Sequence, residues 1–397
     1  WLRVASSAGR MLRIGSAPSR SQRVLVCFRC PRHCVTLTRS TETTGRGLIQ
    51  TGTVTGLCAA ALFRRGAGNT RNFAVVRRVM DTSPAANSTE GMTPTEKFFF
   101  DLNGFLVVRG ALSPEEVAAA NAAVDAHSES IKERKDLRLK NTKAGSPLAG
   151  EHGGPGRCDM GGMLGWPSPH CEPFRELLTH SRLLPYLLEL CGPGYRLDHL
   201  PLLIAQRRGS EGFSLHGGPL TDKGRFNPTL QYRCTNGEFF NSLLAMSVQL
   251  SDHNAGDGGF CVVRGSHKMN FPMPAAFKHG EAFQEHLYQP ETRAGDVVFF
   301  SEATVHGALP WTAEHQRRIV LYRFAPATIS YGRSYSPQWP QEMLQGLSLT
   351  QRAVLEPPYA TRLDRPIVNL GSEEPVVNGR DAKKKEFDQE VFGTRYF

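Results

Sequence analysis

Residues 295–307 read Gly-Asp-Val-Val-Phe-Phe-Ser-Glu-Ala-Thr-Val-His-Gly, a pattern that indicates a β fold. A turn at Gly-Asp leads into branched and aromatic side chains that are typical of a β-strand. The histidine near its end, His306, stands ninety residues after His216, which lies in Ser-Leu-His-Gly-Gly at the end of another strand-like run. Two histidines on separate strands of a β protein can meet in the mouth of a jelly-roll barrel, where ligands bind.

Short apolar runs separated by turn residues continue outward from this stretch, at the spacing of an all-β sandwich or barrel. No helical pattern separates most of them, which argues against a parallel doubly wound sheet. The predicted strands cover 202–207, 212–216, 243–250, 259–263, 296–301 and 318–324. The sequence therefore predicts a mostly β fold with flanking helices, a double-stranded β-helix of the cupin-like jelly-roll kind.

The segments on either side of these strands favour helices. Residues 98–108 indicate a short helix, an Asn-Gly turn and a strand. Ser113 begins a capping box with proline at the first helical position, which predicts a helix over 114–134. Further helices are predicted over 173–179, 182–190, 340–347 and 350–355. Residues 145–170 hold eight glycines, so we expect a long substrate-facing loop or lid there.

Charge is distributed unevenly along the chain. The net charge is +10, but residues 1–80 carry fourteen arginines, no lysine and one acid, a net +13, which leaves −3 for the rest. We expect a basic, disordered leader or transit segment (1–92), a jelly-roll domain (93–370) and a charged tail (371–397). A mildly acidic body predicts no nucleic-acid partner, and no apolar run reaches the roughly eighteen residues of a membrane span.

The leader has the composition of an organelle transit peptide, because it is rich in Arg, Ser, Thr and Gly and nearly free of acid. We therefore expect a mitochondrial or plastid location if it is a transit peptide, and a cytoplasmic one otherwise. Since the chain begins at Trp1 and not at Met, we also expect either a fragment or translated upstream sequence, with Met80 or Met92 as conceivable starts.

An arginine completes the set of candidate site residues. Ferrous oxygenases of this kind bind the metal with two histidines and one carboxylate, which leaves positions for a chelating cosubstrate and oxygen. Arg317 stands eleven residues after His306, at the start of a predicted strand, and a guanidinium can grip a carboxylate with two hydrogen bonds. A surface ion pair is the alternative role. Because side chains alternate along a strand, only one of Arg317 and Arg318 can face the barrel interior.

The body from about residue 93 to residue 367 resembles the phytanoyl-CoA dioxygenase family of 2-oxoglutarate-dependent oxygenases. The matching motifs are 103–110 (NGFLVVRG), 215–216 (LH), 258–268 (GGFCVVRGSHK), 295–300 (GDVVFF), 306–307 (HG) and Arg317. The resemblance implies Fe(II) bound by His216 and His306, 2-oxoglutarate anchored by Arg317, and a structural role for His267. It implies a hydroxylase-type dioxygenase that uses molecular oxygen on a small organic substrate. The sequence indicates neither the substrate nor the oligomeric state.

The chain departs from the family two residues after His216, where Gly218 replaces the usual aspartate ligand. Three explanations are open. Asp222 or Glu211 could supply a carboxylate if a loop folds back. Water or a small anion could fill the position, as chloride does in related iron halogenases that have Gly or Ala there. Alternatively, the chain could bind iron weakly or not at all and be a non-catalytic binding protein that has kept the fold.

Overall fold

The computed structural model describes residues 91–136, 140–332, 339–359, 365–377, 379 and 381–393. The leader predicted over residues 1–92 lies outside these ranges except for its last two residues. Among the described residues, no helix combines the length and the apolar character that a membrane crossing requires.

A capped helix and a strand open the described chain. The helix α1 (Pro94–Asn103) begins with a capping box, in which Thr93 and Glu96 each bond the other's backbone N–H. It ends at Asn103, and the residue that caps it, Gly104, has a φ of 81°, in the left-handed region that glycine adopts without strain. The strand β1 (Phe105–Val108) follows directly. The predicted order of helix, Asn-Gly turn and strand is confirmed.

The second helix is shorter than its sequence predicts. The capping box of Ser113 and Glu116 starts α2 (Pro114–Ala126) where expected. The helix ends at Ala126 because the chain then turns into the short strand β2 (Lys132–Glu133), which joins the edge of a sheet. The predicted continuation to residue 134 is therefore wrong: pairing with the sheet ends the helix early.

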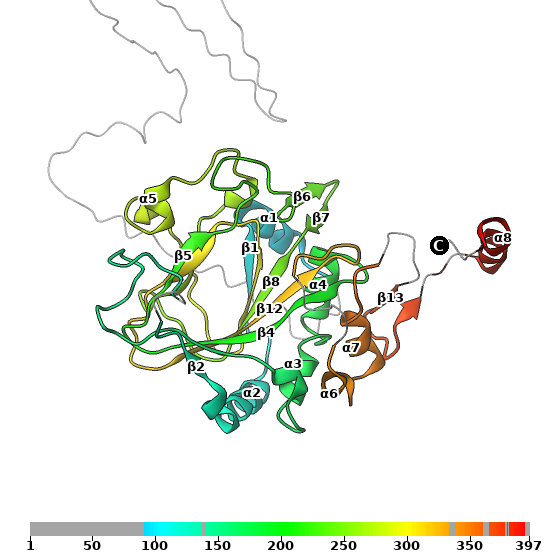
Figure 1. The fold of residues 1–397 in the computed structure, drawn as a ribbon, viewed down its shortest axis with the longest axis horizontal. Coiled ribbons are helices and arrows are strands. Elements are labelled where there is room, and N and C mark those ends of the chain that lie inside the picture. The colour runs from blue at the N-terminus through cyan, green and yellow to red at the C-terminus, as the bar shows by residue number, and fades with distance from the viewer. Residues whose placement is uncertain are drawn as a thin grey trace, which may run out of the picture. The chain divides into compact units, whose positions relative to one another are not determined.

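Two antiparallel sheets form the body, and they confirm the predicted mostly β jelly roll, built as two sheets and not as a closed barrel. Seven strands form the large sheet in the order β1-β10-β8-β12-β4-β3-β2. Its other members are β3 (Cys158–Met160), β4 (Arg196–Gln206), β8 (Leu244–Gln249), β10 (Val297–Ser301) and β12 (Arg317–Ala325). Figure 1 labels β1, β8, β12, β4 and β2 of this sheet. The small sheet has the order β5-β11-β9, with β5 (Phe213–His216), β9 (Gly259–Val262) and β11 (His306–Leu309).

Each of the six strands predicted beyond residue 200 is present. Five agree with the prediction within one residue at each end, whereas β4 begins at Arg196, six residues before the predicted start. The loop predicted over 145–170 is not wholly irregular, because β3 lies within it and pairs with β4. The hairpin of β6 and β7 and the strand β11, which begins at His306, were not predicted. The remaining elements are α3 (Glu172–Glu176), α4 (Leu184–Cys191), β6 (Tyr232–Thr235), β7 (Glu238–Asn241), α5 (Ala275–Lys278), α6 (Gln341–Leu344), α7 (Leu349–Val354), β13 (Pro366–Ile367), β14 (Val376–Val377) and α8 (Ala382–Phe392).

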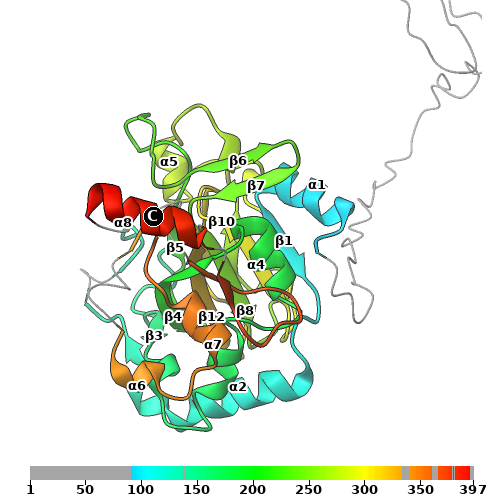
Figure 2. The ribbon, with the colours of Figure 1, turned by 90° about the vertical axis from the view of Figure 1, so that its right-hand side faces the viewer.

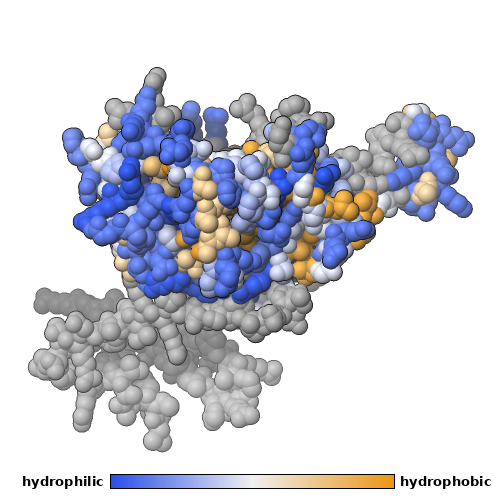
Figure 3. Space-filling view, turned by 90° about the horizontal axis from the view of Figure 1, so that it is seen from below, coloured by the Kyte–Doolittle hydropathy of each residue, from blue (hydrophilic) through white to orange (hydrophobic). Residues whose placement is uncertain are grey.

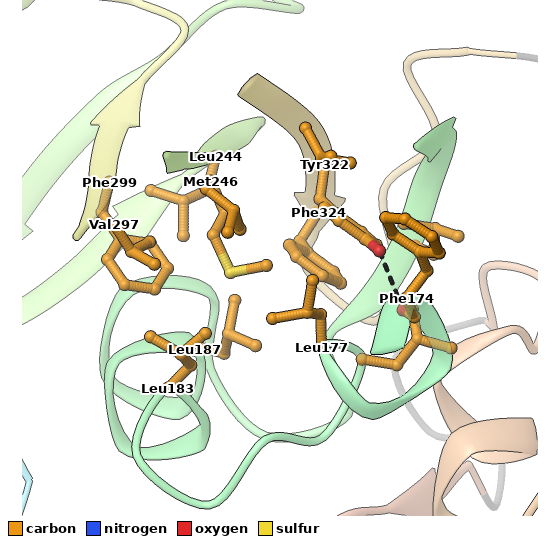
Figure 4. Packing of buried hydrophobic residues seen from close by; sticks show 14 of the residues in the cluster. Phe174, Leu177, Leu183, Leu187, Leu244, Met246, Val297, Phe299, Tyr322 and Phe324 are labelled. Atoms are coloured by element: carbon orange, nitrogen blue, oxygen red, sulfur yellow. Dashed lines mark hydrogen bonds between the residues drawn. The ribbon is translucent and has the colours of Figure 1, made fainter. Parts of the chain in front are cut away.

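The large sheet is buried on both faces. Side chains of β10 alternate, so that Val297 and Phe299 pack with the main core cluster, while Val298 and Phe300 belong to a second cluster on the opposite face. Helices α4 and α7 cover the first face (Figure 2). Leu177 and Leu187 lie among the sheet side chains of this layer (Figure 4). Viewed from below, the described surface is mainly hydrophilic, with separate apolar areas (Figure 3).

A buried aspartate ties the start of β10 to the end of β1. The carboxylate of Asp296 accepts hydrogen bonds from the Arg109 guanidinium at 2.7 Å and from the N–H groups of Gly110 and Arg293, both at 2.8 Å. Its side chain is only 4% exposed. Removing this carboxylate would take the acceptor from two backbone N–H groups and the anionic partner from the Arg109 guanidinium, which also donates to the carbonyl oxygen of Glu291 at 2.7 Å.

Asp296→Ala should therefore lower the free energy of unfolding by about 2–4 kcal/mol, measured by equilibrium urea unfolding. Glu314→Ala is the control, because that side chain is 82% exposed, and it should change stability by less than about 0.5 kcal/mol. A loss below about 1 kcal/mol for Asp296→Ala would contradict the role given to this carboxylate.

Candidate metal centre

The two histidines singled out by the sequence lie opposite each other in the small sheet. Antiparallel pairing of β5 with β11 makes His216 and His306 direct partners, and their ring centroids are 4.2 Å apart. Both line one cavity between the two sheets. The cavity measures about 120 Å³, against the roughly 10–15 Å³ that one water needs. It can therefore hold a small molecule beside an ion.

Backbone carbonyls orient both rings. Nδ1 of His306 lies 2.7 Å from the carbonyl oxygen of Thr304, and Nδ1 of His216 lies 3.1 Å from that of Ser214. A ring nitrogen that faces a carbonyl must carry the proton, so Nε2 of each ring is left with a free lone pair. Burial lowers the pKa of His216 to about 3 and also lowers that of His306. Both rings are therefore neutral near pH 7, as metal binding requires.

A third donor, Glu302, lies beside the histidines. Its side chain is 7% exposed, and its Oε2 lies 3.5 Å from Nε2 of His306. One donor atom from each of His216, Glu302 and His306 lies within 4.8 Å of the others. Burial by itself would raise the pKa of Glu302, but the guanidinium of Arg323, together with the smaller effects of His306 and His216, outweighs burial and lowers this pKa to about 2. The cluster therefore combines two neutral nitrogens with one ionised carboxylate.

Sequence reasoning missed Glu302. The signal was present in the alternation of β10, because Val298 and Phe300 face the cavity side and the next residue in that series is Glu302. It also precedes His306 by four residues. The family pattern predicts a carboxylate close after His216 in the sequence. Glu302 instead lies in the turn between β10 and β11.

The two acids considered from the sequence do not reach the histidines. Asp222 is 76% exposed and pairs with Lys278 at 2.7 Å. Glu211 is buried, but its Oε2 accepts a hydrogen bond from the hydroxyl of Thr142 at 2.6 Å. Neither belongs to the three-residue cluster found among the described residues. The explanation in which either acid replaces the missing ligand is therefore wrong in this structure.

Arg317 lines the same cavity as the histidines. It is 3% exposed and donates from Nη1 to the side-chain oxygen of Gln206 at 2.6 Å. Its Nε is buried without a hydrogen-bond partner, and no carboxylate among the described residues forms an ion pair with it. A Cβ on Gly259 would come within 2.7 Å of that Nε, so glycine makes room for the guanidinium.

Arg317 carries a buried positive charge that its protein neighbours do not balance. Burial, together with the nearby charge of Arg157, lowers its pKa to about 9, which still leaves it cationic near neutral pH. A buried, uncompensated charge is costly, and an anion in the cavity would compensate it. The neighbouring Arg318 instead pairs with Asp125 at 2.7 Å. The prediction that only one of the two arginines faces the interior is confirmed.

His267 has the structural position that the resemblance implies. Its Nε2 lies 2.9 Å from the carbonyl oxygen of Asp101 in α1, and the ring packs edge-on against Tyr232 at 4.5 Å. It is not in the cluster with His216 and His306.

Residues 222–319 match the family model of phytanoyl-CoA dioxygenase (PhyH). Two solved structures are similar. HygX from Streptomyces hygroscopicus, with nickel and 2-oxoglutarate bound, is 22% identical, with a TM-score of 0.49 over 61% of this chain and 90% of that one. SnoK, a non-haem α-ketoglutarate-dependent carbocyclase from nogalamycin biosynthesis, is 18% identical. Its TM-score is 0.44, over 64% of this chain and 92% of that one. No curated protein matches the sequence.

His216→Ala and His306→Ala should each weaken binding of Co(II), a stand-in for Fe(II), by at least about a hundredfold in calorimetric titration. Each substitution removes one of the two imidazole nitrogens that could bind the ion. His286→Ala is the control, since that side chain is 65% exposed, and it should bind Co(II) as the wild type does. Wild-type affinity in both cavity variants would place the metal elsewhere.

Proposed function

We propose that this chain, a phytanoyl-CoA dioxygenase-like protein by its match over residues 222–319, is an Fe(II)- and 2-oxoglutarate-dependent dioxygenase of the hydroxylase type. Its substrate would be a small organic molecule. The observation that carries the proposal is that one cavity holds both His216 and His306, with free Nε2 atoms, and the unpaired cation of Arg317. This chemistry needs ligands for the metal and a cation that binds the carboxylate of 2-oxoglutarate, both in the same cavity.

The donor atoms fit ferrous iron. Two imidazole nitrogens on one side of the cavity leave several coordination positions open toward its interior, which is the arrangement of non-haem Fe(II) oxygenases. Bound iron would supply the oxidising chemistry, with molecular oxygen as oxidant and 2-oxoglutarate converted to succinate and carbon dioxide. The chain's own part is to keep both rings neutral and oriented, which the carbonyl groups of Ser214 and Thr304 do.

Arg317 fits the distal carboxylate of 2-oxoglutarate. Its guanidinium is fixed by Gln206 and lies deep in the cavity, where a carboxylate would gain a charge-assisted hydrogen bond that water does not compete for. Apolar side chains on both sheets form most of the remaining wall, among them Phe260, Phe300 and Ile319. They exclude water from the site and favour a substrate with apolar parts.

The alternatives left by Gly218 have less support. Chloride binding as in a halogenase was inferred from a missing carboxylate, and Glu302 lies at the two histidines with an ionised side chain. A binding protein without catalysis would leave Arg317 buried and uncompensated unless it bound an anion there. The oxygenase accounts for both groups of residues together.

Arg317→Gln should weaken the binding of 2-oxoglutarate to the Co(II)-loaded protein by about ten- to a hundredfold, because it removes one charge-assisted contact. Calorimetric titration without oxygen measures this. Arg318→Gln is the matched control: it lies next in the chain, but its guanidinium pairs with Asp125 on the other face. Equal 2-oxoglutarate affinities in the two variants would refute the anchor.

A further inference from the structure

The backbone at Gly218 would not direct a side chain toward the two histidines. Gly218 has a φ of 96°, and a Cβ built there would meet Met269 Cε at 2.3 Å and Val305 Cγ2 at 3.5 Å. Both belong to an apolar cluster outside the metal centre. A carboxylate at this position would therefore point into apolar packing with a strained backbone. The ligand that the family pattern places here has to come from elsewhere in the chain.

Glu302 lies at a distance from His306 that a shared ion explains. Two donor atoms about 2.1 Å from one ion, at right angles to each other, are about 3.0 Å apart. Oε2 of Glu302 and Nε2 of His306 are 3.5 Å apart, which is longer than an ordinary hydrogen bond. His216 completes the group, with all three donor atoms within 4.8 Å of one another. A small shift of the side chains would let all three contact one ion.

Arg323 holds the carboxylate in place. Its Nε donates to Oε1 of Glu302, so Oε2 is the oxygen left on the side of His306. The backbone N–H of Glu302 is also fixed, by the carbonyl oxygen of Leu243 at 3.0 Å. Arg323 lies on β12, on the cavity side with Arg317 and Leu321. Its contact with a ligating carboxylate is the kind that orients metal ligands in proteins.

We infer that Glu302 is the third metal ligand, positioned by Arg323, and that it replaces the carboxylate absent at Gly218. The ligand set is then His216, Glu302 and His306, with the acid four residues before the second histidine and not two after the first. This inference deepens the proposed function and rests on it. It also places a protein carboxylate where an exogenous anion such as chloride would otherwise bind.

The test is Co(II) binding, measured by calorimetry and by the visible spectrum of the bound ion, with and without chloride. The variants are Glu302→Ala, the near-isosteric Glu302→Gln, Arg323→Gln and the double variant Glu302→Gln with Arg323→Gln. Asp222→Asn is the matched control, because it removes a carboxylate at the surface. His216→Ala reports on the proposed function itself. Circular dichroism checks the fold of each variant, and Glu302→Gln serves if Glu302→Ala does not fold.

If Glu302 is a ligand, both of its variants bind Co(II) at least about tenfold more weakly with an altered spectrum, and Asp222→Asn matches the wild type. Arg323→Gln shows a smaller loss, and the double variant stays as weak as Glu302→Gln. Recovery in the double variant would mean that Glu302 merely neutralises Arg323, and wild-type binding that requires chloride would mean that the position is vacant. Either result overturns the inference.

The proposed function fails in a different way. If the wild type binds no Co(II), or binds it equally well after His216→Ala, the two histidines are not a metal site and the proposed function falls. If His216→Ala abolishes binding while both Glu302 variants bind as the wild type does, the proposed function stands and only the role of Glu302 is lost.

Discussion

Close backbone contact between the end of β5 and the turn after β10 is the constraint on which the centre depends. A Cβ on Gly217 would lie 2.6 Å from the carbonyl oxygen of Thr304 and 2.8 Å from that of Glu302, and its φ is 92°. Only glycine allows the two segments to approach so closely. This approach accompanies the pairing of His216 with His306 and sets Glu302 beside them. Gly217 is therefore required by this close packing.

The two faces of strand β12 have different roles, because one packs in the main core and the other lines the cavity. One of its faces carries Val320, Tyr322 and Phe324 into the main core, where the Tyr322 hydroxyl donates to the carbonyl oxygen of Phe174 at 2.8 Å (Figure 4). The other face carries Arg317 and Arg323 into the cavity. Burying cations is costly, so the well-packed face of β12 holds Arg317 and Arg323 in the cavity.

Much of this arrangement could be predicted from local signals. Alternation and turn residues located the strands, and strand context with the later arginine singled out His216, His306 and Arg317. Glu302 was missed although the alternation of Val298 and Phe300 leads to it, because its position beside His216 depends on a contact between the turn after β10 and the end of β5, which sequence spacing alone does not reveal. The early end of α2 and the strand β3 were missed for a related reason: each is determined by pairing with a distant strand, and β3 lies in a glycine-rich segment with no strand pattern.

Oxygen-dependent turnover of 2-oxoglutarate is the decisive measurement for an Fe(II)- and 2-oxoglutarate-dependent oxygenase. Purified protein with Fe(II) and 2-oxoglutarate should form succinate in air, and succinate should be absent without oxygen or without iron. Slow turnover is expected even without the true substrate, because both cofactor anchors lie in the same cavity. Tight binding of iron and 2-oxoglutarate with no succinate, over a panel of small apolar and mixed substrates, would contradict an oxygenase and favour a binding protein.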